Sequence, residues 1–225
     1  MNFWQSYLNL YASLPDRCEK AWGLISEPVD TVSNIAFFIA TYLIYRLYKK
    51  YNLSGFRFNL LIILVMLIGL GSTVYHAFNN VYTALFDLLP IYFFVFYSLY
   101  SFTSFLSKST AIRIGTPLTL FIIQIGFRAM ELPLFIFGMP TFHLFNILFI
   151  LALSSWAYRR VGKMVNGIFP IVISYSLGIL MRYFDLTICP INGVGTHFLW
   201  HISVAFATYY TARFFVTLSK NKVYL

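Results

Sequence analysis

Charge is what this sequence has least of. Only 10% of its 225 residues are Asp, Glu, Lys or Arg, whereas an average soluble domain carries about 25%. So few charged side chains cannot coat a surface that faces water, which excludes an ordinary soluble domain. The sequence also has no evident internal repeat and no low-complexity linker. We therefore expect one compact domain that is surrounded by lipid.

Long apolar runs fill most of the chain. Hydrophobic residues make up 60% of the sequence and aromatic residues 20%, and the aromatic content suits the interfacial belts of a bilayer protein. A helix needs about 20 apolar residues to cross a membrane. Seven runs are near that length, and they predict an all-α bundle of seven transmembrane helices: 31–48, 58–78, 82–105, 111–128, 141–158, 164–182 and 195–217.

Basic residues predict the orientation of this bundle. Of the 16 Lys and Arg residues, twelve fall on one side of the seven-helix arrangement, and positive residues favour the cytoplasmic side. The N-terminus is therefore expected outside, in the lumen or periplasm, and the C-terminus in the cytoplasm. The net charge of +9 is dispersed between apolar runs, which argues against a nucleic-acid partner. The twelve are Arg46, Lys49, Lys50, Arg57, Lys108, Arg113, Arg159, Arg160, Lys163, Arg213, Lys220 and Lys222.

The chain is expected to have three parts. Residues 1–30 combine an aromatic amphipathic stretch, which is typical of an interfacial helix, with an acidic segment. The stretch has no basic start and no cleavage site, so we do not interpret it as a signal peptide. Residues 31–217 form the membrane domain, and residues 218–225 form a short basic tail.

Three histidines lie at helical spacings near the same predicted depth. His197 and His201 are four residues apart and share one helix face. His76 lies near the outer end of the second apolar run. Three neutral imidazoles form a zinc site with an open position for water, so the pattern predicts a catalytic zinc centre. The alternative is that each histidine is a hydrogen-bonded packing residue. His143 has no histidine partner at helical spacing, and we interpret it as structural.

Ser72 and Asp87 are expected beside this centre. Ser72 lies one turn before His76, and Asp87 lies early in the third run, after a tight turn. An acid within an apolar run needs a partner. Asp87 could accept a proton from the attacking water or orient a histidine ligand, and Ser72 could donate to a developing oxyanion. Alternatively, Ser72 is a small residue that allows close helix packing.

The two cysteines, Cys18 and Cys189, both fall on the outer side of the predicted topology. An oxidising compartment permits a disulfide there. The alternative is that they are two unrelated small apolar residues.

Several of these motifs together resemble the alkaline ceramidases, within a superfamily that includes the adiponectin and progestin receptors. The short loops are most similar to bacterial members. The resemblance covers nearly the whole chain and rests on Cys18-Glu19, Glu27-Pro28, Thr31-Val32-Ser33-Asn34, Gly69-x-Gly71-Ser72-x-x-x-His76, Asp87-x-x-Pro90 and Gly195-Thr196-His197-Phe198-Leu199-Trp200-His201.

The resemblance implies a fold and a chemistry. It implies seven helices, a Cys18–Cys189 disulfide, and zinc on His76, His197 and His201. It also implies hydrolysis of ceramide to a sphingoid base and a fatty acid, with Asp87 activating water and Ser72 polarising the amide carbonyl.

Calcium is a further implied cofactor, because eukaryotic members bind it in the acidic N-terminal segment. The matching acidic positions here are Asp16, Glu19 and Glu27. The sequence departs from the family at Arg17 and Ala21, where Trp and Asn are frequent, and Arg17 adds positive charge beside the expected site.

Two other functions remain open from the sequence. One is a receptor-like or regulatory protein with a structural zinc site, and the other is an ion or proton transporter. We expect an integral membrane enzyme of a bacterial inner membrane or an ER- or Golgi-type membrane, with a lipid substrate as its partner.

Overall fold

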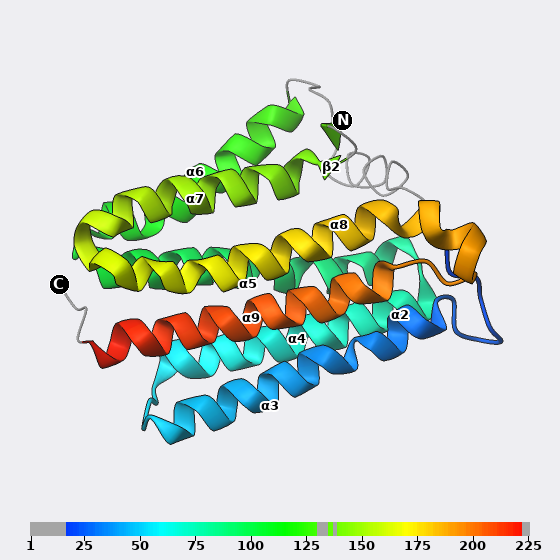
Figure 1. The fold of residues 1–225 in the computed structure, drawn as a ribbon, viewed down its shortest axis with the longest axis horizontal. Coiled ribbons are helices and arrows are strands. Elements are labelled where there is room, and N and C mark those ends of the chain that lie inside the picture. The colour runs from blue at the N-terminus through cyan, green and yellow to red at the C-terminus, as the bar shows by residue number, and fades with distance from the viewer. Residues whose placement is uncertain (1–16, 130–134, 137–138, 222–225) are drawn as a thin grey trace.

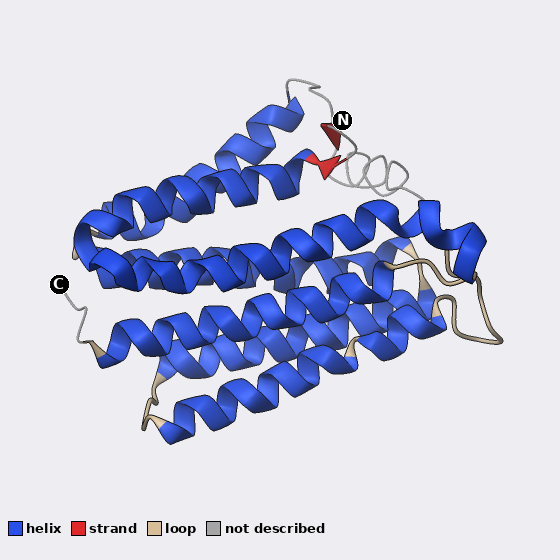
Figure 2. Cartoon of the chain, viewed as in Figure 1, coloured by secondary structure: helices blue, strands red, loops and turns tan. Residues whose placement is uncertain are grey.

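The computed structural model describes residues 17–129, 135–136 and 139–221, and most of this part of the chain is helical (Figures 1 and 2). A single pair of two-residue antiparallel strands lies between α6 and α7. The elements are α2 (Pro28–Ser33), α3 (Ile35–Lys50), α4 (Phe56–Phe78), α5 (Val81–Leu106), α6 (Thr110–Ala129), β1 (Phe135–Ile136), β2 (Met139–Pro140), α7 (Thr141–Val161), the 3-10 helix η1 (Gly162–Ile168), α8 (Phe169–Asn192) and α9 (His197–Lys220).

Helices α3, α4 and α9 pack side by side, and α5 and α8 extend the bundle (Figure 1). Apolar side chains from these helices fill the space between them, including Ile44 of α3, Val65 of α4, Phe105 of α5 and Ala212 of α9, all of them fully buried. The bundle therefore holds the C-terminal end of α4 and the N-terminal start of α9 at fixed positions.

The turn between α4 and α5 is built by two asparagines. Asn79 takes the left-handed conformation that ends many helices, with φ of 39°. Asn80 then caps α5, since its side chain accepts hydrogen bonds from the backbone N–H groups of Tyr82 and Thr83. This tight turn brings the end of α4 next to the start of α5.

The outer surface of the helices is apolar. Large hydrophobic side chains such as Leu70, Leu177 and Phe206 are about half exposed. Within the described part of the chain, three helical stretches are long and apolar enough to cross a membrane: Phe56–Phe78, Val81–Leu106 and His143–Asn192. An apolar exterior of this kind suits lipid, because water would not solvate it.

Helix α8 differs from the sequence-based expectation. The expected span was 164–182, but residues Gly162–Ile168 form a 3-10 helix and α8 runs from Phe169 to Asn192. A proline in its first turn favours this start, and Gly193, with φ of 72°, ends the helix. The expected end at Arg182 was wrong because Asp185, the charged residue that follows it, stays within the helix. Asp185 and Cys189 consequently lie in α8 rather than after it.

The interfacial stretch expected at 1–15, the calcium candidate Asp16 and the last residues of the basic tail lie outside the described residues.

Candidate metal centre

Three histidine rings meet at one end of the bundle. Potential ligand atoms of His76, His197 and His201 lie within 4.8 Å of one another. Their ring centroids are 4.5 Å apart for His76 and His201, 4.9 Å for His197 and His201, and 5.3 Å for His76 and His197. All three residues are at most 3% exposed. Three imidazoles at these separations can converge on one metal ion.

Helix ends position these ligands. His76 lies in the last turn of α4, while His197 begins α9 and His201 lies one turn later. The helical spacing of His197 and His201 places both on the face of α9 that looks toward α4. The sequence predicts that all three histidines lie at the same end of the bundle, and the fold places them there.

Two of the rings are oriented by neighbouring side chains. Ser33 Oγ lies 2.6 Å from His201 Nδ1, and Glu27 Oε2 lies 2.5 Å from His76 Nδ1. A partner on Nδ1 leaves the other ring nitrogen, Nε2, for a metal, and such outer partners are a regular feature of histidine metal sites.

The third ligand is held through its backbone by Asp185. The carboxylate of this buried residue accepts hydrogen bonds from the backbone N–H groups of Thr196 at 2.7 Å, His197 at 2.9 Å and Cys18 at 3.1 Å. Asp185 therefore caps α9 from a different helix. Gly195, with φ of +75°, makes this possible, because a Cβ atom there would collide with Asp185 Oδ1.

Asp185 lies three residues after Arg182 in α8, a spacing at which the two side chains could form an ion pair. The structure instead pairs Asp185 with three backbone groups, and no ion pair joins it to Arg182 within the described residues. The sequence signal that could have identified Asp185 is the one that identified Asp87, namely an acidic residue within an apolar run.

Ser72 and Asp87 meet across the α4–α5 contact. The Ser72 hydroxyl lies within interaction range of the Asp87 side chain, so Ser72 can donate a hydrogen bond to the Asp87 carboxylate. The helices approach closely here because Gly71 has no side chain: a Cβ atom at this position would collide with the carbonyl oxygen of Phe86. Ser72 is buried, one turn from His76. The structure thus brings the two expected catalytic side chains together on neighbouring helices.

Asp30 adds an acid that sequence reasoning did not place at the site. It is fully buried, and neither carboxylate oxygen has a hydrogen-bond partner among the residues that the structure describes. Its Oδ2 lies 3.8 Å from His76 Nδ1, and Glu27, Asp30 and His76 form a second group with ligand spacing. Burial raises the pKa of Asp30 to about 8. A buried, unpartnered carboxylate beside His76 is an environment that favours a cation.

The two described calcium candidates already have protein partners. Glu19 accepts hydrogen bonds from the backbone N–H groups of Val29 at 2.6 Å and Asp30 at 2.9 Å, so it caps the start of α2. Glu27 accepts from Asn79 Nδ2 at 2.7 Å through one oxygen. Its other oxygen contacts Arg17 and His76.

A disulfide anchors the N-terminal segment to this end of the bundle. Cys18 is bonded to Cys189 of α8, with their Cα atoms 5.3 Å apart. The pairing that the sequence favoured is the one present in the structure.

His143 lies apart from the three other histidines. Its Nδ1 is 2.6 Å from the hydroxyl of Tyr175, and its ring packs edge-on against Trp200 with centroids 5.0 Å apart. This hydrogen-bonded packing agrees with the structural interpretation of His143.

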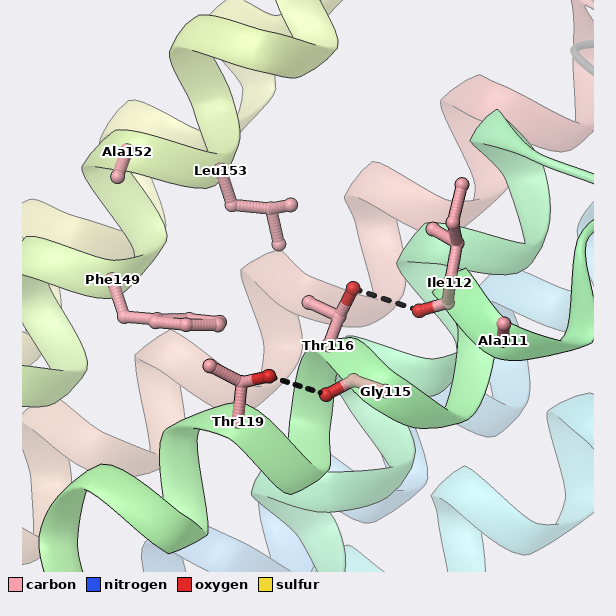
Figure 3. A pocket seen from close by; sticks show the side chains of 8 residues that line it. All are labelled: Ala111, Ile112, Gly115, Thr116, Thr119, Phe149, Ala152 and Leu153. Atoms are coloured by element: carbon pink, nitrogen blue, oxygen red, sulfur yellow. Dashed lines mark hydrogen bonds between the residues drawn. The ribbon is translucent and has the colours of Figure 1, made fainter.

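The pocket in Figure 3 lies between α6 and α7, and it contains no part of the histidine site. It is a groove of about 470 Å³ without an ionisable lining residue. The hydroxyls of Thr116 and Thr119 are bonded to carbonyls of their own helix, at 2.7 and 2.8 Å. The groove therefore offers an apolar surface but no catalytic group. Its lining residues are Ala111, Ile112, Gly115, Thr116, Thr119, Phe149, Ala152 and Leu153.

Comparison with known proteins gives one family. Residues 12–223 match the family model described as Ceramidase. A search of curated proteins found no match. The matched range includes the three histidines, both cysteines, Ser72, Asp87 and Asp185.

Proposed function

The chain belongs to the ceramidase family, and from this premise we propose that it is a zinc-dependent amidase acting within the membrane. Its substrate would be a ceramide-like lipid, which it cleaves at the N-acyl bond to give a sphingoid base and a fatty acid. The observation that carries the zinc mechanism is the buried cluster of His76, His197 and His201, with ligand atoms within 4.8 Å of one another.

The donor set suits zinc. Each histidine would provide one ring nitrogen, and three nitrogens leave a position open for water, as in catalytic rather than structural zinc sites. Bound zinc would supply Lewis acidity and bring the pKa of its water to about 7. Ser33 and Glu27 would keep the rings of His201 and His76 in the orientation that binding requires.

Asp87 and Ser72 would perform the proton transfer and the charge stabilisation. The Asp87 carboxylate would take a proton from the attacking water while the oxygen of that water bonds to the amide carbon. It would then give that proton to the amide nitrogen as the C–N bond breaks, so that the sphingoid amine leaves and the fatty acid remains. The Ser72 hydroxyl, which lies beside Asp87, would donate to the carbonyl oxygen as negative charge develops on it.

The bundle would place this chemistry near the outer leaflet. We expect α3 to α9 to cross the membrane, with the N-terminus outside and the C-terminus in the cytoplasm, because positive residues gather on the C-terminal side. The histidine cluster would then lie where an amide near the lipid headgroups can reach it.

Metal content tests the proposal first. Detergent-purified protein should contain about one zinc per chain by elemental analysis, the number that one three-histidine site holds. His197→Ala should lose this zinc, whereas His143→Ala should keep it, because His143 is bonded to Tyr175 outside the cluster. Folded wild-type protein without zinc, or equal zinc in both variants, would refute the zinc centre.

Hydrolysis of a fluorescent ceramide then tests the role of Asp87. Asp87→Asn should retain zinc and lose hydrolysis by about 100-fold or more, the usual contribution of a positioned acid–base group. An Asp87→Asn variant with wild-type activity would assign proton transfer to another group.

A further inference from the structure

We infer that Arg17 is the permanent cation of the acidic N-terminal segment, so that the metal centre operates without calcium. In this arrangement Arg17 is a positioning residue: it holds Glu27, and Glu27 holds His76. The inference rests on the proposed metal centre but not on the identity of the lipid substrate.

Arg17 lies inside the group of residues that surrounds His76. Its Nη1 is 2.5 Å from Glu27 Oε2 and 2.9 Å from His76 Nδ1. Its guanidinium carbon lies 4.6 Å from the centre of the Tyr75 ring. The side chains of Arg17 and Glu27 are only 12% and 3% exposed. A salt bridge this well buried is weakly screened by solvent, and removing one partner leaves an uncompensated charge.

The contacts of His76 Nδ1 show how the Arg17–Glu27 pair would act on the metal ligand. A guanidinium only donates and a carboxylate only accepts, so Nδ1 can satisfy Arg17 or Glu27 but not both at once. With the other ring nitrogen on a metal, Nδ1 carries a proton and donates it to Glu27. Arg17 then pairs with the same carboxylate oxygen and holds it in place. The result is a chain of contacts from Arg17 through Glu27 to the metal ligand.

Within the described part of the acidic segment, these contacts leave unpartnered carboxylate oxygens only on Asp30. Calcium takes six to eight oxygen ligands. Both oxygens of Glu19 are occupied by backbone N–H groups, and both oxygens of Glu27 have side-chain donors. A divalent ion at Glu27 would also have to displace the guanidinium or lie beside its positive charge. The Arg17 guanidinium therefore supplies at Glu27 the positive charge that a calcium ion bound there would supply.

Calcium binding by the full-length protein tests the inference directly. Calcium-free wild-type protein in detergent is titrated by isothermal calorimetry up to about 1 mM calcium, a concentration at which even weak extracellular calcium modules bind. We expect no saturable heat and no calcium-dependent change in the unfolding temperature. Saturable binding that Glu27→Gln abolishes would overturn the inference.

Zinc affinity tests the positioning role of Arg17. Arg17→Gln should weaken zinc binding by about 10- to 100-fold, the range expected for loss of an outer partner of a histidine ligand. The matched control is Lys20→Ala, which removes the same charge from an exposed residue of the same segment and should leave zinc affinity unchanged. Arg17→Lys keeps the charge and should recover part of the affinity. Equal affinities in Arg17→Gln and Lys20→Ala would overturn the positioning role.

A double-mutant cycle distinguishes a specific interaction between Arg17 and Glu27 from a general loss of structure. If Arg17 acts through Glu27, the combined loss in Arg17→Gln/Glu27→Gln should be smaller than the sum of the two single losses. Additive losses would contradict the chain of contacts. If wild-type protein holds no zinc at all, the proposed function fails, and the calcium titration still decides whether Arg17 replaces calcium.

Discussion

The substitution Asp185→Asn should remove the hydrogen bond by which Asp185 links the N-terminal segment to the start of α9. In Asp185→Asn, the remaining oxygen can still accept from Thr196 and His197, whose N–H groups both bond to Oδ1. The new NH₂ group, however, would face the N–H of Cys18, which now bonds to Oδ2. One charge-assisted hydrogen bond is lost, at a cost of about 1.5–3 kcal/mol. For a chain of this size, that corresponds to a fall of about 3–12 °C in the unfolding temperature.

Asp185→Ala should be far more severe. It would leave three buried N–H groups without a partner, at about 1–3 kcal/mol each, and the sum approaches the whole stability of a typical domain. We expect this variant to accumulate poorly, so the asparagine variant is the informative one.

Thermal unfolding in detergent, followed by tryptophan fluorescence, measures the effect. The matched control is Asn80→Ala, which removes the exposed cap of α5 and should cost about 1 kcal/mol. If Asp185→Asn unfolds at the wild-type temperature, or no lower than Asn80→Ala, the carboxylate does not hold the segment as we argue.

Three further changes test other parts of the structure. Ser33→Ala removes the partner of His201 Nδ1 and should weaken zinc binding by about 10-fold or more, measured by chelator competition; unchanged affinity would exclude an orienting role. Cys18→Ser opens a disulfide that spans 171 residues and should cost about 4–5 kcal/mol. Reductant should then lower the unfolding temperature of wild-type protein but not of the variant. Gly71→Ala should cost about 1–3 kcal/mol, because its methyl group meets backbone of α5, whereas Gly115→Ala, with open space around it, should unfold like wild type.

Local spacing was sufficient to anticipate most of the site. The four-residue interval between His197 and His201 fixes a shared helix face in any α-helix, and the Asn79-Asn80 turn returns the chain so that Asp87 lies beside Ser72. The alternation of apolar runs and polar turns was also enough to place most helices. These features depend on short-range geometry, which the sequence carries directly.

Tertiary contacts of the N-terminal segment could not be anticipated in this way. Arg17 reaches His76, and Asp185 reaches Cys18, because a loop without periodic pattern folds over the helix ends. The end of α8 was placed too early for a related reason. Charged residues normally mark the end of an apolar helix, but here Asp185 is buried by partners from distant parts of the chain.

The histidine cluster draws its ligands from both halves of the polypeptide, and this has a consequence for biosynthesis. His76 belongs to α4, whereas His197 and His201 belong to α9, the last helix among the described residues. The disulfide that fixes the neighbouring segment likewise joins Cys18 to a residue made 171 positions later. A nascent chain that stops after α8 therefore has only one of the three histidines. A metal ion held by all three histidines could therefore bind only after α9 has been made.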